Sequence, residues 1–254
     1  MARSRRRRRS RETTRPSAFW VLAALCIPAF SVFVKLELEG EENLPEEGAF
    51  VLAPNHYSEL DPLAVAIAVY HLGRAPRFLA KESLFTSKLT GWAFRGMGMV
   101  PVSRSSGSRA AKQTIEAAEH LAEHGHGVIV YPEGSLTRDP DMWPMRGKTG
   151  AVRLAFAGGI PLIPMAHWGV QEVLPRYGKR PSLWPLRKRV RLVIGPPVDL
   201  SEYRELPPTP DVLAQATDVV MERVSALLGG LRGQTPPAER WNPSAHGQSE
   251  TGRL

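Results

Sequence analysis

Cysteine is almost absent from this chain: Cys26 is the single one in 254 residues. One thiol excludes an internal disulfide and a Cys-x-x-Cys metal site. Because Cys26 lies inside an apolar stretch, far from any polar cluster, we do not expect a catalytic thiol either. The chain also lacks internal repeats, and 43% of its residues are apolar. This length and composition are sufficient for one α/β domain with a substantial core.

The sequence has no long, uninterrupted hydrophobic run. Residues 18–34 (AFWVLAALCIPAFSVFV) are apolar but number only 17 and contain Pro28, whereas about 20 residues are needed to cross a bilayer. From Val32 the pattern alternates as in a strand. We therefore predict a membrane-associating helix over residues 17–31, lying in the interface, with one transmembrane span as the alternative. No small-residue cleavage site precedes the strand, which argues against a secretory signal.

Acidic residues are scarce at the N-terminus, where Glu12 stands beside eight arginines within residues 1–15. This stretch carries +7 of the formal charge of +8, so the rest of the chain is nearly neutral. We predict that residues 1–16 form a disordered basic tail that binds a polyanion. The adjoining apolar helix favours an anionic membrane surface, on the cytoplasmic face of the cell membrane, over nucleic acid. A non-catalytic polyanion-binding protein is the alternative.

Strand and helix patterns alternate through the middle of the chain. Strands are predicted at residues 32–38, 49–53, 76–80, 99–102, 127–131, 161–166 and 190–194. Helices are predicted at residues 62–71, 109–124, 149–157 and 211–228. The pattern indicates an α/β domain over residues 32–228, with a central, mostly parallel sheet flanked by helices. Residues 229–254 are rich in Gly, Pro, Ser and Gln, which predicts a disordered tail.

A histidine and an aspartate follow the apolar strand at residues 49–53, as His56-x4-Asp61. Histidine suits general-base work because its ordinary pKa is near 6.5, and a carboxylate on its other ring nitrogen orients it as in a protease triad. No protein nucleophile accompanies the pair, so a substrate hydroxyl is the expected nucleophile. The structural alternative is that Asp61-Pro62 simply starts a helix, as N-cap and N1.

A second polar segment, residues 132–138 (PEGSLTR), follows the strand at 127–131. Gly134 permits a tight turn, and Arg138 has the geometry to clasp a phosphate. Further cations near strand ends or loops are Lys81, Arg104, Arg146 and Lys148. In α/β folds ligands gather at the carboxyl ends of strands, so one composite anion site is expected.

Two other patterns are not predicted to be ligand sites. Gly147-Lys148-Thr149 is not a P-loop, because that motif needs a glycine where Met142 stands. His120, His124 and His126 have no obvious carboxylate or thiolate partner set, so no metal site is expected there.

Taken in order, the motifs resemble those of the glycerophospholipid acyltransferase family, especially 1-acylglycerol-3-phosphate acyltransferases. The resemblance spans residues 36–200. The matching segments are Asn55-His56 through Asp61-Pro62, Lys81 through Arg104, Pro132-Glu133-Gly134-Ser135, Gly147-Lys148-x-Gly150, Ile160 through Pro164, and Gly195-Pro196-Pro197. One such motif is weak, whereas four in the right order are highly specific.

The resemblance implies a reaction and a set of roles. His56 deprotonates the free hydroxyl of 1-acylglycerol-3-phosphate, Asp61 orients His56, and the hydroxyl attacks the thioester of acyl-CoA or acyl-carrier protein, giving phosphatidic acid. The implied substrate-binding residues are Glu133, Gly134, Ser135, Arg138, Lys81, Arg104 and Lys148. No cofactor is expected beyond the thioester co-substrate. One departure concerns the acceptor: the family's third motif usually has arginine where Leu136 stands, so another lysophospholipid or a glycolipid is the alternative acceptor.

Overall fold

The structure of the protein is a computed structural model. It describes residues 18–81, 83–86, 96–102 and 108–249, together with Thr13 and Gly91. The predicted basic tail, apart from Thr13, lies outside the described residues, and so does Arg104.

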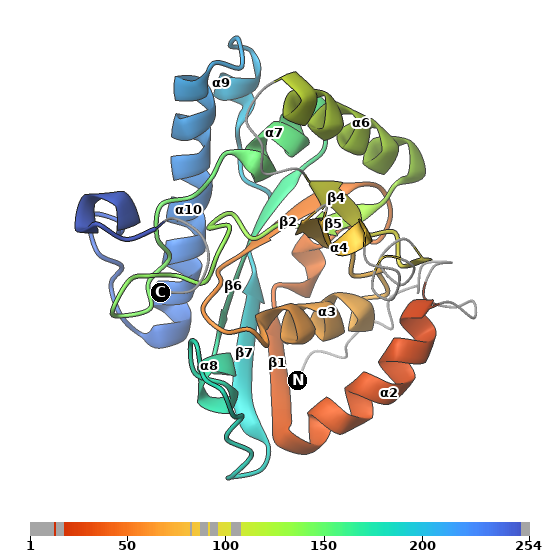
Figure 1. Cartoon of the computed structure of the whole chain (residues 1–254), viewed down its shortest axis with the longest axis vertical. Coiled ribbons are helices and arrows are strands. Elements are labelled where there is room, and N and C mark those ends of the chain that lie inside the picture. The colour runs from red at the N-terminus through yellow and green to blue at the C-terminus, as the bar shows by residue number, and fades with distance from the viewer. Residues whose placement is uncertain are drawn as a thin grey trace.

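A five-stranded sheet forms the centre of the domain (Figure 1). Its order is β1 (Val34–Glu39), β7 (Lys188–Ile194), β6 (Leu162–Trp168), β2 (Phe50–Pro54) and β5 (Gly127–Ile129). Neighbours pair in parallel except for β6 and β7, which are antiparallel. The prediction of a mostly parallel sheet in an α/β fold is thus confirmed.

The antiparallel pairing of β6 with β7 brings opposite strand ends together. Met165 pairs with Ile194, and Trp168 with Arg191. The carboxyl ends of β2, β5 and β6 therefore share one edge of the sheet with the first residues of β1 and β7. We refer to this as the catalytic edge, since the polar motifs that follow β2 and β5 lie there.

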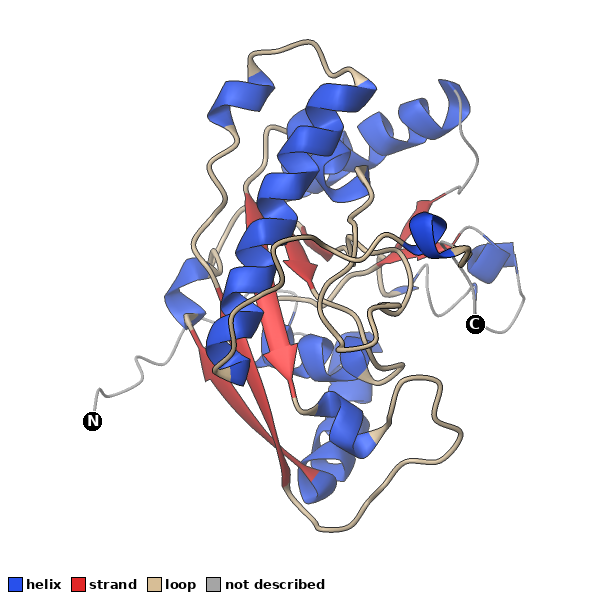
Figure 2. Ribbon diagram, turned by 90° about the vertical axis from the view of Figure 1, so that its left-hand side faces the viewer, coloured by secondary structure: helices blue, strands red, loops and turns tan. Residues whose placement is uncertain are grey.

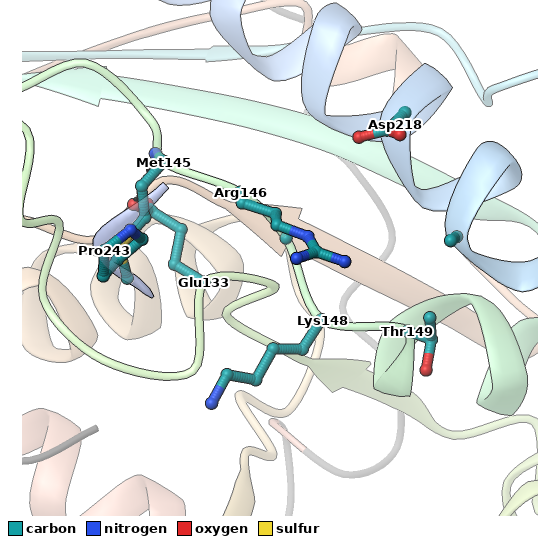
Figure 3. Close-up of a pocket in the computed structure, with 9 residues that line it drawn as sticks. Glu133, Met145, Arg146, Lys148, Thr149, Asp218 and Pro243 are labelled. Carbon is teal, nitrogen blue, oxygen red and sulfur yellow. Dashed lines mark hydrogen bonds between the residues drawn. The ribbon is translucent and has the colours of Figure 1, made fainter. Parts of the chain in front are cut away.

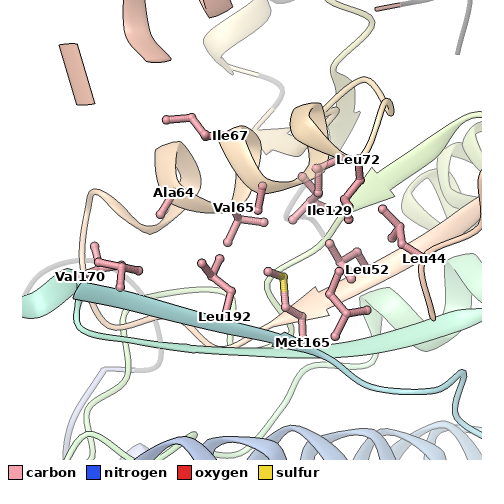
Figure 4. Packing of buried hydrophobic residues seen from close by; sticks show 14 of the residues in the cluster. Leu44, Leu52, Ala64, Val65, Ile67, Leu72, Ile129, Met165, Val170 and Leu192 are labelled. Carbon is pink, nitrogen blue, oxygen red and sulfur yellow. The ribbon is translucent and has the colours of Figure 1, made fainter. Parts of the chain in front are cut away.

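Helices cover both faces of the sheet (Figure 2). Strand side chains alternate between the faces: Leu52 belongs to the core formed with α3 (Asp61–His71), and Val51 to the core on the opposite face. Figure 4 shows the α3 side of this packing. The helices that line the opposite face include α6 (Ser108–His124), α7 (Gly150–Ala157) and α10 (Pro210–Arg232).

Two short strands form a separate sheet. β3 (Leu79–Lys81) pairs in parallel with β4 (Val100–Val102), and α4 (Ser83–Thr86) follows β3. Other short elements were not predicted, because a single turn carries too little periodicity to detect. They are η1 (Glu41–Asn43), α8 (Val170–Val173), α9 (Ser201–Arg204) and η2 (Pro243–His246).

Most of the C-terminal segment predicted as a disordered tail, residues 229–254, belongs to the described part of the structure. Thr209 caps α10 by accepting the Val212 N–H, and α10 continues to Arg232, where Gly233 ends it at φ 64°. Beyond it, Trp241 accepts the Arg146 N–H through its carbonyl and stacks on His246 at 3.6 Å. Composition alone does not show these contacts.

The apolar N-terminal stretch forms α2 (Ala18–Phe33), with Pro28 inside it. Ile27 and Phe30 pack on the core beside α3, whereas Trp20 and Leu25 are exposed. Among the described residues, no helix is both long enough and apolar enough to cross a bilayer.

Candidate active site

His56 and Asp61 form a hydrogen-bonded pair at the catalytic edge. His56 Nδ1 lies 3.0 Å from Asp61 Oδ2, and the Asp61 side chain is fully buried. A carboxylate only accepts hydrogen bonds, so in the neutral imidazole this contact favours the tautomer with its hydrogen on Nδ1, which leaves Nε2 as the acceptor. The His56 side chain is 17% exposed, so part of the ring remains accessible. This is the arrangement of a general base and its orienting acid.

The carboxylate of Asp61 is held by the chain that precedes it. Oδ2 also accepts the N–H groups of Tyr57, at 2.6 Å, and Ser58, at 2.7 Å. The alternative that Asp61-Pro62 starts a helix is confirmed in its position, because α3 begins at Asp61, but Leu60 and not Asp61 holds the N-cap position. Asp61 thus bonds the loop between β2 and α3, which is the loop that carries His56.

The imidazole of His56 is fixed from two further directions. Its ring stacks on Tyr131, with 4.1 Å between centroids, and Tyr131 stacks on Phe78 at 6.3 Å. The backbone N–H of His56 donates to Glu133 Oε1 at 2.8 Å, and its carbonyl accepts the Thr137 N–H at 2.6 Å. The loop after β5 therefore sets the position of a base carried by the loop after β2.

Glu133 joins three segments through its fully buried carboxyl group. Oε1 accepts from His56, and Oε2 accepts the Met145 N–H at 3.1 Å. Burial raises the pKa of Glu133 to about 8, and hydrogen bonds from the Met145 and His56 backbone offset only part of that effect. In this conformation Glu133 positions the base.

A pocket of about 290 Å³ opens beside Glu133 (Figure 3). Arg146 and Lys148 project from the same stretch of chain along it, and Asp218 of α10 lies on its wall. The Lys148 side chain lies close against Gly134, where a Cβ would come 3.0 Å from Lys148 Cδ. Gly134 has φ 70°, so both its conformation and its neighbour favour glycine. Two cations therefore line an opening next to the residue that positions His56.

The other predicted substrate-binding residues lie elsewhere. Arg138 is only 2% exposed and Leu136 8% exposed, so neither side chain reaches solvent appreciably. Ser135 is half-buried, and its hydroxyl lies 3.4 Å from the Leu136 carbonyl. Lys81 ends β3, but its side chain, like the whole of Arg104, falls outside the described part of the structure.

A buried histidine that sequence reasoning missed lies behind Asp61. His167, on β6, is fully buried; its Nε2 lies 2.8 Å from the Asn55 carbonyl and its Nδ1 3.1 Å from Tyr57 Oη. Nδ1 is also 3.8 Å from Asp61 Oδ1. Burial lowers the pKa of His167. The available signal was a lone histidine within the otherwise apolar strand LIPMAHW.

The three clustered histidines lie away from this site. His120, His124 and His126 have ring centroids 4.2–5.9 Å apart, at the end of α6 and just beyond it. Across the described ranges, no group of three or more His, Cys, Asp or Glu is placed to hold a metal ion.

Comparison with known proteins supplies a family. The family model described as "Acyltransferase" matches residues 35–168, a little more than half of the chain. A chloroplastic 1-acyl-sn-glycerol-3-phosphate acyltransferase of Brassica napus is 31% identical over 144 residues, covering 56% of this chain and 40% of its own length. A 1-acyl-sn-glycerol-3-phosphate acyltransferase of Bacillus subtilis is 29% identical, covering 80% of this chain and 94% of its own length.

A solved structure shares the fold. The 1-acyl-sn-glycerophosphate acyltransferase PlsC from Thermotoga maritima superposes with a TM-score of 0.61 at 24% identity, over 88% of this chain and 81% of that one. The chain spans about two fifths of the length of its plant chloroplast relatives.

Proposed function

Because this chain belongs to the acyltransferase family, we propose that it transfers a fatty acyl chain from an acyl thioester to the free hydroxyl of 1-acylglycerol-3-phosphate, making phosphatidic acid. The donor is acyl-CoA or acyl-carrier protein, and no other cofactor takes part. The observation that carries the proposal is the buried Asp61 carboxylate bonded to Nδ1 of His56.

The residues present account for each step. His56 Nε2 removes the proton of the acceptor hydroxyl as its oxygen attacks the thioester carbonyl. The new C–O bond forms, the C–S bond breaks, and the departing sulfur takes the proton from Nε2. The Asp61 carboxylate stabilises the transient imidazolium. Substrate supplies the nucleophile, so no acyl-enzyme is formed.

His56→Ala tests the reaction. Free-thiol release from acyl-CoA, dependent on added acceptor, should fall by about 10²–10⁴-fold, the usual contribution of a positioned base. His71→Ala is the matched control, since His71 is exposed at the other end of α3 and its loss should leave the rate within error. Normal thiol release by His56→Ala would show that the mechanism is wrong.

Recognition of the acceptor phosphate is assigned to the cations of the predicted site: Lys148, Arg138, Lys81 and Arg104. Support is strongest for Lys148, which lines the pocket beside Glu133, and Arg146 adds a second cation there. Arg138 is buried, so its guanidinium contacts the acceptor only after the loop at 133–138 shifts. Gly134 and Ser135 belong to the same loop and shape the entrance.

Acceptor kinetics separate these cations. Lys148→Ala should raise the acceptor KM about tenfold with little change in kcat, because it removes ground-state binding of a charge. Arg153→Ala, an exposed cation on α7, is the control. If Arg138→Ala raises KM and Lys148→Ala does not, phosphate recognition moves to the buried arginine.

Leu136 favours a second candidate acceptor. The arginine typical of this position in the family is absent, and Leu136 is nearly buried. We therefore keep a lysophospholipid with a larger head group, or a glycolipid, as the alternative. A panel of acceptors with both thioester donors decides: faster turnover of another acceptor than of 1-acylglycerol-3-phosphate would favour it.

The acyl chain has a suitable apolar pocket nearby. A cavity of about 160 Å³ lies between α2 and α3 and is also lined by Phe78, Met97 and Met99. Phe78 stacks on Tyr131, which stacks on His56, so aromatic rings connect this cavity with the base. We place α2 in the interface of the cell membrane, on its cytoplasmic face, with exposed Trp20 and Leu25 toward lipid.

A further inference from the structure

The loop between α8 and β7 exposes an apolar tip framed by cations. Every residue from Pro181 to Arg187 is exposed, with Leu183 at 43%, Trp184 at 79% and Leu186 at 48%. Residues 173–198 contain seven lysines and arginines and no acidic residue. Large apolar side chains that cluster on the surface of a protein usually mark an interaction site.

Hydrogen bonds at the base of the loop hold its tip outward. The Ser182 N–H donates to the Val173 carbonyl at 2.7 Å. Lys188 Nζ lies 2.6 Å from the Glu172 carbonyl and 2.8 Å from the Ser182 hydroxyl. The two arms of the loop are thereby tied together below residues 183–186.

The loop rises from the catalytic edge. It leads into β7 at Lys188, which pairs with Val34, the residue directly after α2. In both Figure 1 and Figure 2 the loop and the end of α2 occupy the same lower end of the molecule. The tip and the C-terminal end of α2 therefore lie at one end of the sheet.

The base of the loop also contacts the catalytic loops. The Ser58 hydroxyl donates to the Leu174 carbonyl at 2.7 Å. Arg176 Nη1 donates to the carbonyls of Thr137, at 2.8 Å, and Asp139, at 2.7 Å. The orientation of the tip is thus coupled to the loops that hold His56.

We propose that residues 179–189 form a second membrane contact, in which Trp184, Leu183 and Leu186 enter the interface of an anionic bilayer and the flanking cations bind lipid phosphates. Tryptophan has an amphipathic ring suited to the head-group level, and lysines and arginines beside it bind anionic lipid. Together with α2, the loop would hold the catalytic edge against the surface that contains the acceptor. The inference rests on the proposed function only for that last step.

Binding of the full-length protein to vesicles tests the inference. Vesicles of phosphatidylcholine with about a third phosphatidylglycerol, and vesicles of phosphatidylcholine alone, are compared by flotation. The double variant Trp184→Ala/Leu186→Ala should bind the anionic vesicles about ten- to a hundredfold more weakly, because both substitutions remove apolar surface that would otherwise be buried in the bilayer. Leu206→Ala is the matched control: Leu206 is also 48% exposed, but it follows α9 at the opposite end of the molecule in Figure 1.

Two single substitutions of arginine test whether the loop binds anionic lipid. Arg180→Gln and Arg187→Gln should each weaken binding to anionic vesicles about fivefold and leave the weak binding to phosphatidylcholine unchanged. Equal loss on both vesicle types would overturn the assignment to anionic lipid.

Three further outcomes would overturn the inference. The first is unchanged vesicle binding by the double variant, and the second is an equal loss of binding in Leu206→Ala. The third is a change of oligomeric state in the double variant, measured by sedimentation equilibrium, which would make a second copy of the chain the partner. His56→Ala separates this inference from the proposed reaction, since it should lose acyl transfer and bind vesicles like the native protein.

Discussion

Asp61 lies between two imidazoles, and its two oxygens have different surroundings. Oδ2 accepts from His56 and from two backbone N–H groups, whereas Oδ1 makes no hydrogen bond within the described structure and faces His167 at 3.8 Å. His167 is itself held by Asn55 and Tyr57. The surroundings of the His56–Asp61 pair thus include one residue of β6, His167, that is more than a hundred positions away in sequence.

Glu133 should make the stability of the protein depend on pH. Its pKa is raised from 4.5 to about 8 by burial, so between those values the folded protein holds a proton that the unfolded chain has released. The free energy of unfolding is then highest below the unfolded pKa and falls as pH rises, by about 1.4 kcal/mol per pH unit from this residue. Glu133→Gln should flatten that slope in urea unfolding between about pH 5 and about pH 8.

The native protein and Glu133→Gln are compared by how steeply the free energy of unfolding changes with pH. Its absolute value is not compared, because glutamine also places an amide N–H₂ near a backbone N–H and lowers stability at every pH. Glu172→Gln, at an exposed position, is the control and should keep the native slope. If Glu133→Gln keeps it as well, Glu133 is ionised in the folded protein at neutral pH.

At the scale of elements, strands and helices with strong periodicity were predictable, and their assembly was not. The patterns at residues 161–166 and 190–194 indicated strands, but nothing in them distinguishes a parallel neighbour from the antiparallel pairing of β6 and β7. Single-turn helices such as α8 are too short to show a helical period of apolar residues in the sequence. In the C-terminal segment, the Trp241 carbonyl accepts the N–H of Arg146, a residue far away in sequence, and composition does not show such a contact.

The candidate site, too, was only partly predictable from the sequence. His56 and Asp61 were found because their spacing within one loop is short and their chemistry is distinctive. The bond from His56 N–H to Glu133 spans 77 positions, and the contact of His167 with Tyr57 spans 110. Such contacts are set by strand pairing, so they cannot be predicted from composition or local spacing.

The segment at 145–149 packs tightly on α10, and a glycine makes this possible. A Cβ on Gly147 would lie 2.7 Å from Met221 Cγ and 2.8 Å from Thr217 Cγ2. Thr217 cannot easily yield, because it is buried and its hydroxyl donates to the Leu213 carbonyl at 2.7 Å. Gly147→Ala should therefore lower the free energy of unfolding by about 1–3 kcal/mol, measured by urea denaturation.

Gly150→Ala is the control within the same segment. No heavy atom lies within 4 Å of a Cβ there, and Gly150 is the first residue of α7. Alanine should leave stability unchanged or raise it by up to about 1 kcal/mol. Equal effects of the two substitutions would contradict a close approach specific to Gly147.

At the scale of the whole molecule, net positive charge is concentrated in the N-terminal sequence, and large exposed apolar side chains include those of α2 and of residues 183–186. Residues 1–15 carry +7 of the net +8, and α2 leads from them to the first residue of β1 at the catalytic edge. The rest of the chain is nearly neutral overall, so outside the cations of residues 179–189 it adds little attraction to an anionic surface.

Deletion of residues 1–15 should therefore weaken binding to anionic vesicles by about tenfold or more and reduce its dependence on salt, since screening acts on the exposed arginines. Thiol release with a water-soluble, short-chain acceptor should continue at the native rate, because the dyad and its supports lie in residues 55–167. Flotation at low and high salt, together with that assay, measures both effects. A deletion variant with unchanged salt dependence would assign the electrostatic attraction to residues 179–189 alone, and one that loses thiol release would place the arginines in the reaction itself.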